Sequence, residues 1–146
     1  MQFTKEELTA LLSGEKPLQL AGLDLSKASL SGADLSKADL TEANLNRAFL
    51  DNAKLRYATL SKANLEDADL SEANFHNANL AEAELSGANL HGADLSGTNF
   101  SGANLGYVNL TETNLSGINL KEAKYNTHTQ WPQGFDPLAA GAILIQ

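Results

Sequence analysis

The stretch ANLHGADLSGTNFSGANL, residues 88–105, decides the fold, because it repeats a single five-residue unit. In each unit an Ala or Thr is followed by an Asn or Asp and then by a Leu or Phe. A period of five matches neither the 3.6 residues of a helical turn nor the two-residue alternation of a strand. No single regular element can therefore keep these apolar residues on one side.

The same register extends over most of the chain. Every fifth residue from Leu20 to Tyr125 is Leu, Phe or Tyr, and the residue two positions earlier is Ala in most units. Residues two apart in an extended segment point to the same side, so the Ala and the Leu are predicted to face inward. The other two residues of the unit must then turn the chain. A chain that turns every five residues closes into a coil, and stacked coils form a solenoid.

The predicted turns fall into two groups. Some units have glycine at the third turn position, which needs a positive φ in a type II turn. These glycines are Gly22, Gly32, Gly87, Gly92, Gly97, Gly102 and Gly117. Lys37, Glu42 and Arg47 occupy the same position in other units. There we expect turns whose φ stays negative.

The units ADLSG, ADLSK and ANLED resemble those of the pentapeptide repeat family, and the resemblance covers residues 18–125. It implies an all-β solenoid, a right-handed quadrilateral β-helix with the central Leu or Phe inside and four pentads in each coil. Residues twenty apart would then stack, and the row Asp34, Lys54, Asn74 and Asp94 would place no two acids next to each other. Such alternation is what a stable ladder needs, because stacked like charges repel.

We interpret residues 1–146 as one domain with a cap at each end, because a solenoid exposes its terminal coils. Residues 1–17 would form an N-terminal helical cap, residues 18–125 the β-helix and residues 126–146 a C-terminal cap. A helix is predicted over residues 4–13, since Thr4 and Glu7 have capping-box spacing and Gly14 follows as a stop. The apolar side chains predicted to cover the first coil are Leu8, Leu11 and Leu12.

Two interpretations of the tail remain open. The stretch THTQWPQGFDPLAAGA, residues 127–142, resembles the tails of cyanobacterial pentapeptide repeat proteins. An apolar run begins within it at Leu138 and extends to Ile145. The tail could fold over the last coil as a cap. Since exposed apolar patches also mark association, it could instead form the interface of a homodimer. The expected state is therefore a monomer or a homodimer mediated by the tail.

The charge pattern limits the partners. The net charge of −8 argues against direct binding of nucleic acids or anionic membranes, which use basic patches. Residues 27–62 hold six bases against four acids, whereas residues 63–120 hold eight acids and no Lys or Arg.

The chain has no Cys, and its first residues contain no apolar run of signal-peptide length. We expect a soluble protein of the cytoplasm that is not exported.

No pattern in the sequence indicates catalysis. His76, His91 and His128 are the side chains that titrate near neutral pH, and we interpret them as solvated surface residues. A catalytic or metal site needs several convergent groups, which the repeat does not supply. We therefore expect no enzyme activity, no cofactor and no metal site.

The function predicted from these observations is that of a protein-binding scaffold with an unknown partner. The resemblance implies an alternative, because some pentapeptide repeat proteins imitate duplex DNA and bind DNA gyrase. The bases in the N-terminal half weaken that alternative. Outward residues are the candidate contacts. They are the acids Glu66, Asp67, Asp69, Glu72, Glu82, Glu84 and Asp94, and the aromatic residues Phe49, Tyr57 and Tyr107.

Overall fold

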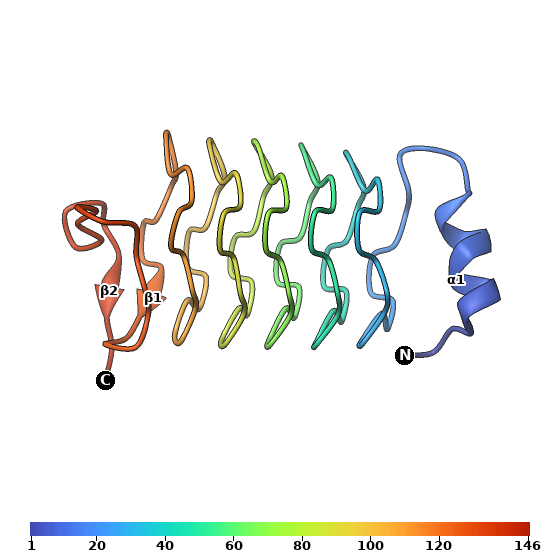
Figure 1. The fold of residues 1–146 in the computed structure, drawn as a ribbon, viewed down its shortest axis with the longest axis horizontal. Coiled ribbons are helices and arrows are strands. Elements are labelled where there is room, and N and C mark those ends of the chain that lie inside the picture. Colours follow the sequence, from blue (N-terminus) through green and yellow to red (C-terminus); the bar gives the residue numbers. More distant parts are fainter.

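The computed structural model describes residues 1–146 as a rod of stacked coils with one helix at its N-terminal end (Figure 1). The helix is α1 (Lys5–Leu12), and the only two strands are β1 (Lys124–Tyr125) and β2 (Ile143–Leu144). Between α1 and β1, single-residue parallel bridges join consecutive coils. The helix is too short to cross a membrane.

The coils stack with a register of twenty residues, which confirms the expected four pentads per coil. Asn44 bridges Asn64, and Asn64 bridges Glu84. Within this ladder the amide of Leu45 donates to the carbonyl of Asn64 at 2.7 Å, and the amide of Asn64 donates to the carbonyl of Ala43 at 3.0 Å. The same pair of bonds recurs on each side of the coil, so main-chain hydrogen bonds join neighbouring coils on all four sides.

The interior consists of stacked Leu and Ala side chains, as the pentad pattern predicts. Leu65 and Ala63 are both 0% exposed, and Phe75 and Phe100 take the central position in two coils without becoming exposed. Each Leu buried in this way contributes about 1.5–3 kcal/mol before conformational entropy is counted. The ladder becomes less complete near its end, where Leu115 is half-buried.

The prediction of negative φ at non-glycine corners was wrong. The φ angles of Lys37, Glu42 and Arg47 are 62°, 58° and 58°, in the same region as the glycine corners. The reason is the ladder: the Arg47 amide donates to the carbonyl of Glu66 in the next coil at 2.8 Å, which fixes the orientation of the turn. A left-handed conformation costs an L-residue roughly 1–2 kcal/mol, so the stacked coils must offset that cost.

The N-terminal helix has the capping box that the sequence predicts. The Glu7 amide donates to Thr4 Oγ1 at 3.1 Å, and the Thr4 amide donates to Glu7 Oε1 at 3.3 Å. The helix ends at Leu12 with Ser13 as its C-cap, one residue earlier than the predicted end at residue 13. Leu8 is buried against the first coil, and Leu11 and Leu12 pack there half-buried. The helix therefore covers one end of the core.

The hydrogen-bonded coil continues past the end of the sequence repeat. The Gln130 amide donates to the carbonyl of Val108 at 2.9 Å, and the Leu110 amide donates to the carbonyl of Gln130 at 2.7 Å. These are the bonds of a regular pentad, but Asn109 and Gln130 are twenty-one residues apart because one residue is inserted at the preceding corner. Further on, β2 pairs in parallel with β1. The tail thus adds an incomplete coil.

Candidate interaction surface

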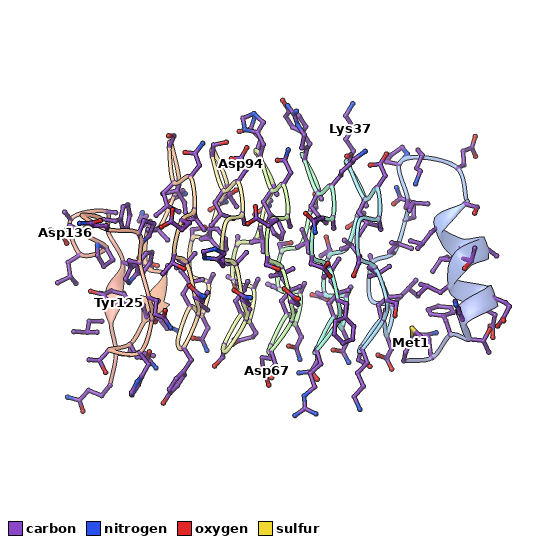
Figure 2. All side chains as sticks on the ribbon, viewed as in Figure 1. Met1, Lys37, Asp67, Asp94, Tyr125 and Asp136 are labelled. Carbon is purple, nitrogen blue, oxygen red and sulfur yellow. The ribbon has the colours of Figure 1, made fainter.

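Most of the predicted acidic contacts lie on one coil, residues 66–85, where they occupy three of its four corners and two of its four sides. We call them the acidic girdle, which consists of Glu66, Asp67, Asp69, Glu72, Glu82 and Glu84. Asp67, Glu72 and Glu82 occupy positive-φ corners and are exposed. Asp94 belongs to the next coil, and Figure 2 shows it near the edge of the rod opposite Asp67. The carboxylates are therefore close along the axis but do not form a single stripe.

The carboxylates of the girdle differ in how freely they can bind a partner. Asp69 Oδ1 accepts hydrogen bonds from the amide and the hydroxyl of Ser71, at 3.1 Å and 2.7 Å, and so completes a turn. Glu84 Oε2 accepts one from Asn104 Nδ2 at 3.0 Å.

Asp94 completes a turn in the same way as Asp69. Partial burial raises its pKa, but hydrogen bonds from the hydroxyl and the amide of Ser96 lower it by more. Its carboxylate is therefore ionised and already hydrogen-bonded to Ser96. Compared with Asp69, Glu84 and Asp94, the corner carboxylates are more available to contact another protein.

Basic residues precede the girdle. The basic coil, residues 46–65, carries Arg47, Lys54, Arg56 and Lys62. Arg47 Nε lies 3.9 Å from Asp67 Oδ2, and both side chains are largely exposed. A pair that is screened by solvent to this degree contributes little to stability. The rod surface thus changes from basic to acidic between two neighbouring coils.

A coil whose four corners are all glycine follows the girdle. We call residues 86–105, with corners Gly87, Gly92, Gly97 and Gly102, the glycine coil. A Cβ atom added at Gly87 would collide with Asp67 Oδ1, and one added at Gly92 would collide with Glu72 Oε1. The girdle side chains therefore lie across the glycine corners and point along the rod. The repeat pattern alone did not reveal this relation.

The three candidate aromatic residues face outward, which confirms the prediction. Phe49, Tyr57 and Tyr107 are 50%, 48% and 60% exposed. Phe49 bridges Asp69 on the next coil, and Tyr107 occupies the same corner as Asp67, two coils further on. These two aromatic residues therefore flank the girdle on one side of the rod, which we call the Phe49 side. Tyr57 lies at a different corner.

The corner that carries Tyr57 is electropositive. The Arg56 guanidinium lies 5.8 Å from the centre of the Tyr57 ring. A hydrogen bond from the Asn77 side chain, followed by one from Arg56, lowers the pKa of the Tyr57 hydroxyl below its usual value. The charge around this corner differs from that of the Phe49 side, so the two sides would suit different partners.

Two of the three histidines are integrated into the ladder, which corrects the expectation that all are simply solvated. His76 Nδ1 lies 2.8 Å from Ser96 Oγ, and the Ser96 hydroxyl donates to Asp94 Oδ1 at 2.6 Å. In a catalytic triad the serine hydroxyl donates its hydrogen bond to the histidine, whereas here the Ser96 hydroxyl donates to the Asp94 carboxylate.

Ser96 is therefore not activated as a nucleophile. His91 and Thr111 repeat the arrangement at 2.7 Å, with the Thr111 hydroxyl donating to Asn109. His128 is exposed, and its ring stacks on Tyr107 with a centroid separation of 5.1 Å. No cluster of three or more His, Asp or Glu side chains is arranged to hold a metal ion.

Comparison with known families agrees with this architecture. The family model described as pentapeptide repeats matches overlapping segments that together reach from residue 19 to residue 121. The chain belongs to the pentapeptide repeat family. A comparison with curated protein sequences gave no match.

Solved structures of other pentapeptide repeat proteins resemble the chain. Rfr23 from the cyanobacterium Cyanothece 51142 is 39% identical over 68% of this chain, with a TM-score of 0.43. A protein from the Arabidopsis thaliana thylakoid lumen is 30% identical over 75% of this chain, with a TM-score of 0.49. The chain spans 64% and 66% of the length of these two proteins.

A third solved structure is more distant in sequence. QnrB1, a plasmid-mediated fluoroquinolone resistance protein, is 16% identical over 88% of this chain and 90% of its own, with a TM-score of 0.38. At this level of identity the similarity concerns the repeat fold alone.

Proposed function

We propose that the chain is a non-catalytic scaffold that binds a protein partner on the outer surface of the β-helix. The observation that supports this is the Phe49 side, where Phe49 is exposed one coil before Asp67 and Tyr107 is exposed two coils after it. Exposed aromatic residues are favoured in protein interfaces. The Phe49 amide donates to the carbonyl of Ala28 at 2.9 Å, and the Tyr107 amide donates to Asn126 Oδ1 at 3.1 Å. Because the backbone of both residues is held in this way, they are presented with little loss of conformational freedom on binding.

The chemistry of the Phe49 side indicates what kind of partner would fit. Phe49 and Tyr107 offer apolar area, and Glu66 and Asp67 add negative charge between them along the rod, where Arg47 at the same corner pairs with Asp67. A complementary surface would carry an apolar contact flanked by Lys or Arg. Charges at the rim of such a contact act mainly on the rate of association and on the choice of partner.

The test compares two variants in affinity capture from an extract of the source cells. The first variant, Phe49→Ser with Tyr107→Ser, removes both aromatic residues from the Phe49 side. The matched control, Tyr57→Ser, removes one exposed aromatic residue from a different corner. A protein retained by the wild type and the control but lost from the double variant would support the proposal. Equal retention by all three would contradict it.

A DNA-gyrase-binding mimic of duplex DNA is the second candidate. The acidic girdle and the absence of Lys and Arg from residues 63–120 favour it. Duplex DNA, however, carries its charges continuously along the axis, whereas the girdle surrounds one coil next to a basic one. We therefore rank this function second.

A supercoiling assay with purified DNA gyrase and relaxed plasmid, with and without a fluoroquinolone, tests the second candidate. The mimic predicts inhibition or protection by the wild type at micromolar concentration. It also predicts loss of that effect when Glu66, Asp67 and Glu72 are changed to Lys. An assay without any effect of the wild type would contradict it.

We also infer the finer features of the fold that the family resemblance implies. The β-helix would wind right-handed, and α1 and the tail would act as its caps. Leu138 and Leu144 are 59% and 48% exposed at the C-terminal end, so we propose that the tail both covers the last coil and forms a homodimer. Sedimentation should give a dimer mass for the wild type and a monomer mass for Leu138→Ser with Leu144→Ser. A monomeric wild type would contradict the dimer.

A further inference from the structure

At the N-terminal end of the ladder, the main-chain N–H and C=O groups of the outward residues have no preceding coil to form hydrogen bonds with. In a regular coil the outward residue directs its N–H and C=O to the preceding coil, as Asn64 does with Ala43 and Leu45. The first coil has no predecessor. Its outward residues are Gln19, Asp24, Ser29 and Asp34. Such an exposed edge is a template for pairing with another extended segment.

The chain itself covers part of this edge. Asp24 donates its amide to Gln2 Oε1 at 2.7 Å and accepts from the Gln2 amide at 3.4 Å. The carbonyl of Asp34 accepts from Lys16 Nζ at 3.1 Å. Ser29 and Gln19 are exposed, and neither makes a main-chain hydrogen bond through its own N–H or C=O. Two positions of the edge are therefore open.

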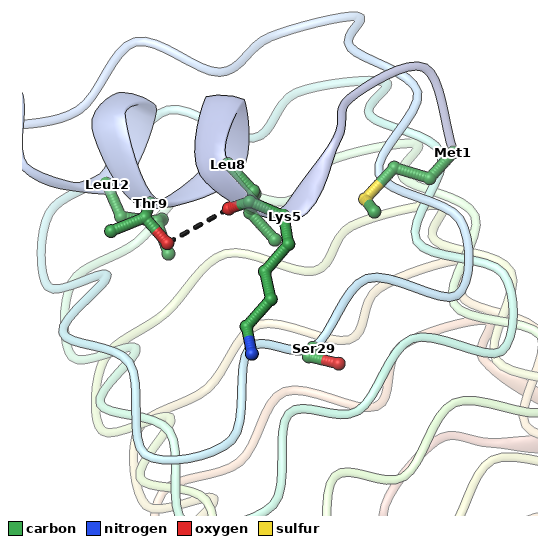
Figure 3. Close-up of a pocket in the computed structure, with 6 residues that line it drawn as sticks. All are labelled: Met1, Lys5, Leu8, Thr9, Leu12 and Ser29. Carbon is green, nitrogen blue, oxygen red and sulfur yellow. Dashed lines mark hydrogen bonds between the residues drawn. The ribbon is translucent and has the colours of Figure 1, made fainter.

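Only one of the open positions adjoins a cavity. A cavity of about 260 Å³ separates α1 from the first coil beside Ser29, and Gln19 does not line it. Its lining residues are Met1, Lys5, Leu8, Thr9, Leu12 and Ser29. Figure 3 shows the Lys5 side chain extending from the helix toward the backbone next to Ser29. This volume is smaller than typical sites for drug-sized ligands and suits one or two aliphatic side chains.

We propose that this cavity and the free edge of Ser29 bind an extended peptide segment of another protein with an apolar–acidic–apolar sequence. The segment would add one strand to the first coil. The Ser29 amide would donate to the carbonyl of the first apolar residue, and the Ser29 carbonyl would accept from the amide of the second. This is β-strand addition, in which main-chain bonds supply affinity and pockets supply specificity.

The mode of pairing is the one that Ser29 already has on its other side. There the Leu30 amide donates to the carbonyl of Phe49 at 2.7 Å, and the Phe49 amide donates to the carbonyl of Ala28 at 2.9 Å. In a pentad the residues on either side of the outward one point inward. The two apolar residues of the peptide would accordingly enter the cavity against Leu8 and Leu12.

Charge selects the middle residue of the segment. Lys5 lines the cavity beside Ser29, and its side chain extends toward the backbone next to that residue. A cation beside the outward position of an added strand favours a carboxylate there. This site goes beyond the scaffold function proposed above, because it lies at the end of the rod and the peptide would contact neither the Phe49 nor the Tyr107 side chain, although Ser29 stacks on the main chain of Phe49.

The direct test is NMR titration of the ¹⁵N-labelled full chain with the capped peptide acetyl-Leu-Asp-Leu-amide. The Ser29 amide resonance should shift saturably, while that of Gln19, the matched open position without a cavity, should stay in place. A control peptide methylated on the amide nitrogen of its second Leu lacks the donor for Ser29 and should bind at least about tenfold more weakly. A second control with Lys in place of Asp should also bind more weakly.

Variants of the protein test the cavity and the charge separately. Thr9→Phe fills the cavity and should weaken peptide binding at least about tenfold, as expected when apolar burial is lost. Lys5→Glu should weaken it about threefold to tenfold, since the exposed charge is reversed. Lys62→Glu makes the same charge change far from the site and should have no effect. Unchanged amide shifts in the β-helix would show that each variant is folded.

Three results of the titrations with peptide would overturn the proposal. They are equal shifts at Ser29 and Gln19, equal affinity for the methylated peptide, and equal affinity of the Lys5→Glu variant. A Ser29 shift that appears on concentrating the protein without peptide would identify a second copy as the occupant, which also contradicts the proposal. The variant Tyr107→Ser changes the Phe49 side four coils away from Ser29 and should retain peptide binding, so a failure of the scaffold function can be distinguished from a failure of this site.

Discussion

The acidic girdle and the glycine coil have almost the same backbone, but the corners of the girdle carry side chains and those of the glycine coil carry none. Glu72 has a φ of 58° and Gly92, one coil further on, has a φ of 71°. Each donates its amide to the next coil, Glu72 to His91 at 2.9 Å and Gly92 to Thr111 at 3.0 Å. The ladder therefore imposes the turn on whichever residue stands at the corner. The glycine is needed for a different reason, since it leaves room for the side chain of the preceding coil.

The largest effect is expected inside the rod, at Leu65, the last residue of the basic coil, whose amide donates to Glu84 of the girdle at 2.7 Å. Leu65→Asp would place an unpaired carboxylate where the exposed fraction is 0%. Burying an unpartnered carboxyl is costly even when it becomes neutral, and the Leu packing is lost as well, so the combined cost is comparable with the roughly 5–15 kcal/mol that stabilises a typical domain. Circular dichroism should show an unfolded chain, whereas Leu65→Ala should remain folded with a loss of about 2–5 kcal/mol. A folded Asp variant would contradict the inward assignment.

Adding a side chain to the glycine coil should have the next largest effect. Gly97→Ala places a Cβ at a φ of 67° and against Asn77 Oδ1. We expect a loss of about 1–2 kcal/mol from the backbone conformation, with a further contribution from the collision. Chemical denaturation of Gly97→Ala, Asn77→Gly and the double variant separates the two causes. If the double variant loses as much stability as the simple sum of the two single variants, the collision has no energetic weight.

Removing a side chain from the girdle should have a smaller effect of the opposite sign. Glu72→Gly relieves an L-residue of positive φ, but it also gives the unfolded chain more conformational freedom. The balance should raise the free energy of unfolding by at most about 1 kcal/mol. Denaturant titration measures this balance. A variant less stable than the wild type would show that the ladder already removes the strain at this corner.

Acid should act mainly on the N-terminal coils, where outward positions carry Asp rather than Asn. Hydrogen bonds from the side chains, and then the amides, of Ser26, Ser36 and Thr41 lower the pKa values of the carboxyls that they contact. Those carboxyls are Asp24, Asp34 and Asp39. A lowered folded-state pKa gives stability that is fully present above the unfolded value, about 3.9, and is lost as the pH falls through the folded value.

The measurement is thermal unfolding between pH 5 and pH 2 of the wild type and of a variant in which Asp24, Asp34 and Asp39 are replaced by Asn. Asn accepts the same turn hydrogen bonds elsewhere in the ladder, as Asn64 does from the Glu66 amide at 2.9 Å. The Asn variant should lose less stability in acid. Identical acid sensitivity would rule out these carboxyls as its source.

The smallest effect is expected at the boundary between the basic coil and the girdle. Arg47→Ala removes the 3.9 Å ion pair with Asp67, which is exposed to solvent on both partners. Pairs of this kind contribute roughly 0–1 kcal/mol, so the free energy of unfolding should change by less than about 0.5 kcal/mol. A loss above 1 kcal/mol in denaturant titration would show that the charge contrast between the coils has a structural role.

The sequence predicted the interior well because burial follows a strict pattern of residue types. The inward Leu and Ala positions, the capping box at Thr4 and the outward aromatic residues were all read from spacing. The corners were misjudged at Lys37, Glu42 and Arg47, since a local preference for negative φ is weaker than the hydrogen bonds between coils. The coil around Gln130 was missed, because an inserted residue and the lack of Leu hide the pentad there.

The candidate surface, like the fold, could be predicted from the sequence only in part. Composition identified the acids and the exposed aromatic residues, but their neighbours depend on a register of twenty that no single residue encodes. Only the stacked coils place Phe49 beside Asp69, direct the Ser96 proton to Asp94 and leave Ser29 open next to a cavity.

By itself the sequence determined that the chain turns every five residues and which side chains lie inside, because apolar burial is the dominant favourable term and repeats with the pentad. The number of pentads in a coil was implied only by the family resemblance and not by the residues themselves, and the tertiary structure alone decided which non-glycine corners adopt positive φ and which edge remains unpaired. These features depend on hydrogen bonds between residues about twenty apart, whose energies appear only when the coils are stacked.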